Sequence, residues 1–100
     1  MRFAIFLDNL NFEHLSRNVK QMYLFDLTDN IIIAVGEESV FMENANYILL
    51  RLLSKKVTFI FIDGLADNII LLFAQAGIEV KTLSELKENP LMDTILFKEI

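Results

Sequence analysis

Acidic side chains directly follow two strongly apolar runs. Asp8 comes after the run over 3–7, and Asp63 comes after the run over 57–62. Ligands of open α/β sheets bind outside the carboxyl ends of parallel strands, which is where both residues are expected. Asp67 lies four residues beyond Asp63, in the first turn of an expected helix. Because Mg²⁺ and Mn²⁺ prefer oxygen ligands, these three carboxylates form a candidate metal set.

The same carboxylates also fit ordinary local roles. Asp8 and its neighbour Asn9 have the residue types of an Asx-turn, and Asp67 has the residue type of a helix cap. Such side chains favour turns and caps on purely local grounds. The sequence leaves the structural and the metal-binding interpretation open.

His14 is the only histidine, and the chain has no cysteine. One imidazole can act as a metal ligand or as a proton carrier. A conventional zinc site would need a second histidine or a thiolate, and the sequence offers neither. An isolated histidine equally fits an ordinary side chain. We keep His14 as a candidate metal ligand and cofactor-binding residue, and the lack of cysteine agrees with a reducing compartment.

The composition indicates one folded domain over residues 1–100. Hydrophobic residues make up 54% of the 100 residues and charged residues 23%, which excludes intrinsic disorder. A net charge of −5 disfavours nucleic acid as a partner, because binding to phosphates is mostly cationic. The apolar excess suggests a homodimer interface. No apolar run has the length of a membrane span or of a secretory signal, so we expect a cytoplasmic protein without a membrane partner.

The periodicity predicts the order β-β-β-α-β-α-β-α. The predicted strands cover 3–7, 22–27, 31–35, 57–62 and 78–80, with Gly36 ending the third. The first predicted helix follows the N-cap Asn44 and carries an apolar stripe from Ala45 to Leu53. The second covers 66–76 and ends at the C′ glycine Gly77. The third starts at the capping pair Thr82 and Glu85 and stops near Asn89. Residues 12–18 fit a short helix or a loop, and 91–97 fit a helical turn or an edge segment. The alternation predicts an α/β layered domain with a mixed sheet.

Five segments occur in a fixed order along the chain. The segment 13–18, Glu-His-Leu-Ser-Arg-Asn, runs into 22–27, Met-Tyr-Leu-Phe-Asp-Leu. Later come the strand 58–62, the loop 63–66 and the string 75–80, Gln-Ala-Gly-Ile-Glu-Val. Together they resemble the dinitrogenase iron-molybdenum cofactor biosynthesis family. Its members carry His-Phe-Gly-Arg-Ala, a strand of the type Phe-x-Ile-Tyr-Asp-Val, a Gly-Gly-Ile-Gly loop and a helix ending in Glu-Ala-Gly-Ile-Glu-Val. The resemblance covers most of residues 1–88.

This resemblance implies a three-layer ribonuclease-H-like domain with a mixed five-stranded sheet. It further implies a small non-enzymatic domain that binds or carries an iron–sulfur or iron–molybdenum cluster precursor, working with metallocluster-assembly proteins. The cofactor-binding residues that it implies are His14, Asp63, Gly64, Leu65 and Ala66. The chain departs from the family pattern where Leu15 and Ser16 follow the histidine, where the loop keeps one glycine, and in lacking cysteine, the usual cluster ligand.

Two alternatives remain. The string Phe-Leu-Asp-Asn-Leu over 6–10 resembles the opening of the PIN-like NYN nucleases, in which an aspartate after the first strand helps to bind Mg²⁺. That resemblance implies a divalent-metal-dependent nuclease using Asp8, Asp63 and Asp67. The other alternative is a domain that only mediates protein contacts through its apolar surface.

Overall fold

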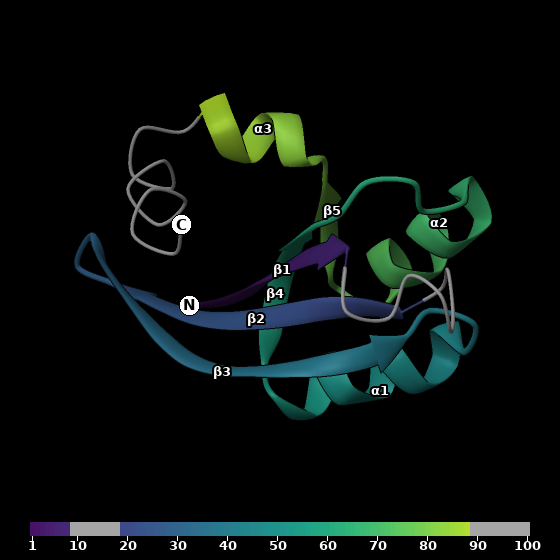
Figure 1. Ribbon diagram of the computed structural model, residues 1–100, viewed down its shortest axis with the longest axis horizontal. Helices are drawn as coiled ribbons and strands as arrows, with labels where there is room; N and C mark the ends of the chain where they lie inside the picture. The colour runs from purple at the N-terminus through teal and green to yellow at the C-terminus, as the bar shows by residue number, and fades with distance from the viewer. Residues whose placement is uncertain (9–18, 89–100) are drawn as a thin grey trace.

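The computed structural model describes residues 1–8 and 19–88, in which five strands form one sheet in the order β3-β2-β1-β4-β5 (Figure 1). The strand β1 is antiparallel to β2, and β2 to β3, whereas β4 is parallel to both β1 and β5. The elements in chain order are β1 (Arg2–Asp8), β2 (Val19–Thr28), β3 (Ile31–Phe41), α1 (Ala45–Ser54), β4 (Val57–Phe61), α2 (Asp67–Gln75), β5 (Glu79–Lys81) and α3 (Leu83–Glu88). The predicted element order and mixed sheet are confirmed.

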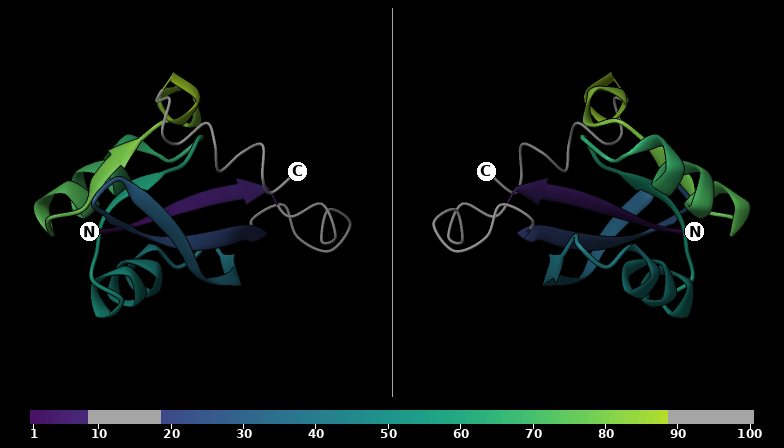
Figure 2. Two further views of the ribbon diagram at one scale, coloured as in Figure 1. Left: turned by 90° about the vertical axis from the view of Figure 1, so that its left-hand side faces the viewer. Right: turned by 90° about the vertical axis from the view of Figure 1, so that its right-hand side faces the viewer.

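Helices cover both faces of the sheet. Ala4 and Phe6 of β1 point into a core shared with α1 and α2, whereas Phe3 and Ile5 point into a second core shared with α3. Figure 2 shows α3 on the side of the sheet opposite α1. Successive strand residues face opposite sides, so a strand buried on both faces needs an unbroken apolar run, as β1 has. The result is a three-layer α/β domain.

Aromatic rings fix β1 between its neighbours on the α3 face. The ring of Phe3 stacks on Phe25 of β2, with centroids 5.3 Å apart, and on Phe59 of β4, with centroids 5.0 Å apart. Phe61 meets Phe3 edge-on at 6.0 Å. Stacked and edge-to-face pairs add stabilisation beyond the area that they bury. The cluster therefore ties three strands together through one buried side chain.

The third strand extends beyond the predicted end at Gly36. Asp29 and Asn30 adopt positive φ angles of 53° and 62°, which closes a two-residue hairpin between β2 and β3. Leu24 pairs with Gly36 while Phe25 pairs with Ala34, so a bulge leaves one extra residue in β3. The strand continues to Phe41 after this bulge. The predicted end was wrong because an edge strand tolerates both a glycine and the polar residues that follow it.

Two predicted helix boundaries are confirmed by their hydrogen bonds. Asn44 caps α1, because its Oδ1 accepts from the backbone N–H of Tyr47 at 3.0 Å. Thr82 and Glu85 form the capping box of α3: the Glu85 N–H donates to Thr82 Oγ1 at 3.3 Å, and the Thr82 N–H donates to Glu85 Oε1 at 3.2 Å. Gly77 has a φ of 93°, as a C′ glycine after α2 requires.

The sequence interpretation of Asp67 as a helix cap was wrong. Ala66 occupies the N-cap of α2 and makes no side-chain cap bond, and Asp67 is the first helical residue. The predictions for 12–18 and 91–97 lie outside the described residues. In the part of the chain that the structure describes, no helix has both the length and the apolar character that a membrane crossing requires.

Candidate functional site

The ends of β1 and β4 lie at one edge of the sheet. These strands are parallel neighbours, with Ile5 paired to Phe61. Asp8 ends β1 three residues beyond Ile5, and Asp63 follows Phe61 by two residues. The topology thus brings Asp8 and Asp63 to the same edge, where a ligand site of an open α/β sheet is expected.

The segment that carries His14 is attached to this edge at both of its ends. The strand β1 ends at Asp8 and β2 begins at Val19, and Asp8 is the strand partner of Lys20. His14 itself lies outside the described residues. Its position relative to the loop over 63–66 stays a prediction.

Asp8 is engaged by a cation of the neighbouring strand. Its Oδ1 lies 2.7 Å from Nζ of Lys20, and the Asp8 side chain is 80% exposed while that of Lys20 is 21% exposed. An ion pair this open to water is worth at most about 1 kcal/mol. Lys20 therefore neutralises Asp8 without contributing much to stability.

Asp63 helps to start α3. Its Oδ1 accepts a hydrogen bond from the backbone N–H of Leu83 at 3.0 Å. The first amides of a helix have no partner within the helix, and a carboxylate satisfies one of them here. Leu83 packs against the core on the α3 face, so this bond joins the end of β4 to the helix that covers it.

The loop between β4 and α2 holds the remaining residues of the predicted site. Gly64 has a φ of 77°, a conformation that favours glycine, and open space surrounds the position of a Cβ there. Leu65 packs against the core shared with α1 and α2, whereas Gly64 and Ala66 are exposed. One partly buried side chain anchors the loop, and its other residues are exposed.

The three predicted carboxylates do not form a metal-binding group by themselves. Within residues 1–8 and 19–88, no cluster of three or more histidine, aspartate or glutamate side chains is placed to hold a metal ion. Asp67 sits in the first turn of α2, where a negative charge complements the helix dipole. A metal set that includes His14 involves a residue outside the described range and stays a prediction.

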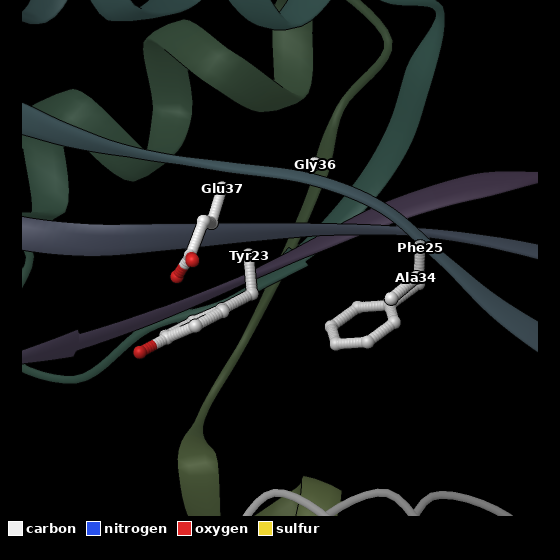
Figure 3. A pocket seen from close by; sticks show the side chains of 5 residues that line it. All are labelled: Tyr23, Phe25, Ala34, Gly36 and Glu37. Atoms are coloured by element: carbon white, nitrogen blue, oxygen red, sulfur yellow. The ribbon is translucent and has the colours of Figure 1, made fainter.

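A separate hollow of about 220 Å³ lies on the α3 face of β2 and β3. Figure 3 shows the rings of Tyr23 and Phe25 and the carboxylate of Glu37 projecting to the same side of the strands. Ala34 and Gly36 complete its lining. Tyr23 lies three residues along β2 from Lys20, which is about 10 Å at strand spacing. The hollow is therefore distinct from the edge that holds Asp8.

Sequence reasoning did not single out this hollow. The signal was present in β2, because Tyr23, Phe25 and Leu27 alternate and so share one face of the sheet. Glu37 had no signal of its own, since it joins that face only after the bulge in β3.

No protein-family profile matches the chain, and no curated protein sequence matches it either. Among solved structures, the crystal structure of PH0822 is similar, with a TM-score of 0.56, 18% sequence identity, and coverage of 82% of this chain and 78% of PH0822. The Fowlpox virus resolvase, solved in complex with substrate Holliday junction DNA, is similar with a TM-score of 0.54 and 9% identity. That match covers 82% of this chain and 59% of the resolvase chain. These likenesses concern the fold alone, and the fold is α/β and ribonuclease-H-like, with a mixed five-stranded sheet.

Proposed function

We propose that this chain is a small, cytoplasmic, non-enzymatic binding domain that takes its ligand at the sheet edge formed by the ends of β1 and β4. The cargo that we propose is an iron–sulfur or iron–molybdenum cluster precursor, exchanged with metallocluster-assembly proteins. His14 and the loop from Asp63 to Ala66 border the site. The likeness of the fold to PH0822 is compatible with this proposal and assigns no ligand.

One observation carries the proposal: the ends of β1 and β4 meet at this edge, and the carboxylates there, Asp8 and Asp63, already have partners within the chain. Lys20 pairs with Asp8, and the Leu83 N–H donates to Asp63. A hydrolytic metal site needs carboxylates that are free to converge on the ion. The described residues supply no such group of three. The arrangement therefore suits holding a ligand better than metal-assisted hydrolysis.

The ligand chemistry of the chain sets the kind of binding that we expect. Iron–sulfur clusters are normally held by cysteine thiolates, and the sequence has none. The site that we propose combines the imidazole of His14 with the carboxylate oxygens of Asp8 and Asp63. Such a set leaves part of the coordination to ligands that arrive with the cargo, so we expect transient carriage rather than permanent incorporation.

The test is a thermal-shift series of the purified protein with Mg²⁺, Mn²⁺, Fe²⁺ and a reconstituted iron–sulfur cluster. A ligand at 100 times its dissociation constant adds about 2.7 kcal/mol to the free energy of unfolding, or about 10–20 °C in Tm for a chain of this length. We expect a shift with iron or with the cluster, lost in His14→Ala and kept in the control Gln75→Ala at the end of α2. Visible absorption of the cluster co-eluting with the protein is the second readout.

Two outcomes would overturn the proposal. A shift with Mn²⁺ that disappears in Asp8→Asn, together with RNA cleavage lost in the same variant, would establish the nuclease alternative. The nuclease alternative keeps one structural argument, the position of Asp8 and Asp63 at the ends of adjacent parallel strands. No shift with any of these additives would leave a domain that only mediates protein contacts.

A further inference from the structure

The two outermost strands of the sheet, β5 and β3, are built differently. The edge strand β5 has three residues, and its ends carry opposite charges, with Lys81 Nζ 3.7 Å from Glu79 Oε2. The other edge strand, β3, has eleven residues. Natural sheets protect their edges from pairing with other chains by short strands and charged side chains. The edge formed by β5 has both of these protections.

Protection of β3 is confined to one half of the strand. The bulge at Val35 and the glutamates Glu37 and Glu38 protect its second half. The segment Ile31–Val35, which we call the edge segment, contains no charge and no proline and reaches the bulge only at its last residue. The side chains of Ile31, Ile33 and Val35 are 62%, 58% and 43% exposed. In Figure 1 the β2–β3 hairpin, whose second strand begins with this segment, extends past α1. An uncharged, exposed, apolar edge is a template for a further strand.

We propose that the edge segment pairs with the edge segment of a second copy of this chain, in antiparallel orientation about a two-fold axis near Ile33. The segment is apolar at all five positions, so it complements itself and offers no charge to a charged partner. An isologous contact of this kind closes after two chains. The proposal is independent of the ligand site, which lies at the ends of β1 and β4.

Charge selects the antiparallel orientation. Parallel pairing in register would place Glu37 of one copy beside Glu37 of the other, and like charges directly opposite each other destabilise a sheet. Antiparallel pairing about Ile33 sets Ile32 against Ala34 of the other copy, with Ile31 and the bulge residue Val35 at the two ends of the contact. The glutamates then lie beyond the paired segment.

The size of the contact predicts a dimer that depends on concentration. A stable specific interface buries about 800 Å² of each partner, roughly one eighth of the 6584 Å² of this chain. Five paired residues with three exposed aliphatic side chains bury less than that. Each chain also carries a net charge of −5, so salt is expected to strengthen the dimer by screening the repulsion.

The first experiment is sedimentation and light scattering from micromolar to millimolar concentration. We expect the mass to rise from 11.6 kDa to twice that value in the native chain. Ile33→Lys is expected to raise the dissociation constant at least about tenfold, because a two-fold interface meets the substitution twice. Leu50→Lys and Leu71→Lys, at side chains 65% and 58% exposed on α1 and α2, are the matched controls and are expected to dimerise as the native chain does.

Cysteine cross-linking tests the geometry without relying on the charged variant. The chain has no cysteine, so Ile33→Cys introduces a single thiol that meets its own copy at the two-fold axis. We expect mild oxidation to give a disulfide dimer with Ile33→Cys and little with Leu50→Cys or Leu71→Cys. A native chain that stays at 11.6 kDa throughout, or equal cross-linking at all three positions, would overturn the proposal.

Discussion

Arg51 on α1 pairs with Glu38 on β3 through two parallel hydrogen bonds. Nε of Arg51 donates to Oε1 at 2.8 Å, and Nη2 donates to Oε2 at 2.6 Å. The guanidinium also lies 5.8 Å from the centroid of the Tyr47 ring. This two-point contact links α1 to β3, and a fork of two donors matches a carboxylate in one orientation.

We expect Glu38→Gln to lower the melting temperature modestly, with a smaller loss at high salt. Both side chains are about one-third exposed, so solvent screens the pair. The hydrogen bonds and charge of Glu38 raise the pKa of Arg51 above its ordinary value. A raised pKa stabilises the fold below the ordinary value and loses that effect only as the pH rises through the raised value. Melting curves should therefore show no pH dependence from Arg51 between mildly acidic and mildly alkaline pH. The control for Glu38→Gln is Glu88→Gln, at an exposed glutamate on α3.

The glycines provide a matched comparison of backbone conformation. Gly64 and Gly77 have φ angles of 77° and 93°, and a Cβ at either position meets no atom within 4 Å. Gly64→Ala and Gly77→Ala are therefore expected to destabilise by about 1–2 kcal/mol through conformation alone. Gly36 has no positive φ, and its Cβ would meet only Leu24 Cδ1 at 3.9 Å. Urea denaturation of Gly36→Ala should show no comparable loss, and an equal loss in all three variants would contradict this explanation.

Local signals in the sequence predicted the order of the elements along the chain. The unbroken apolar runs of β1 and β4, the stripe of α1 and the glycine after α2 each depend on near neighbours in the chain. The contacts of the candidate site do not. Asp63 bonds to Leu83, twenty residues away, and Asp8 meets Lys20 only because β2 returns beside β1. Hydrophobic periodicity does not encode partners that are brought together by the fold.

The extent of β3 was unpredictable for a related reason. Glycine followed by two glutamates is a typical strand end when read locally. In the structure the pairing partner β2 continues, so β3 absorbs Gly36 at a bulge and extends to Phe41. The position of Glu37 beside Tyr23 follows from that bulge and not from the residues around it.

Phe3 is expected to be the most sensitive position on the α3 face. Its ring is fully buried and touches three other phenylalanine rings. Phe3→Ala removes these contacts and leaves a cavity, so we expect a loss of about 3–5 kcal/mol in the free energy of unfolding. The control is Phe41→Ala, at a side chain 63% exposed, with an expected change within about 0.5 kcal/mol. Similar losses in both variants would show that burial in this structure does not govern the stability.

The N-terminus of α2 can be improved at one position. Ala66 has the extended conformation of an N-cap, with φ −65° and ψ 147°, but its side chain accepts no hydrogen bond. Ala66→Ser supplies an acceptor for the first amides of the helix and is expected to raise the stability by about 1 kcal/mol. Ala74→Ser, at an exposed position within the same helix, is expected to lower the stability by about 0.5 kcal/mol. Thermal melting of the two variants should move in opposite directions.

Two substitutions of Asp63 separate its structural role from ligand binding. Asp63→Asn keeps an oxygen that accepts from the Leu83 N–H, so the stability should stay within about 0.5 kcal/mol of the native chain. Asp63→Ala removes the acceptor at the start of α3 and is expected to cost about 1 kcal/mol. If the carboxylate charge also contributes to ligand binding, both variants lose affinity for iron or the cluster equally. Binding that follows the stability, weakened in Asp63→Ala and unchanged in Asp63→Asn, would show that Asp63 serves only to join β4 to α3.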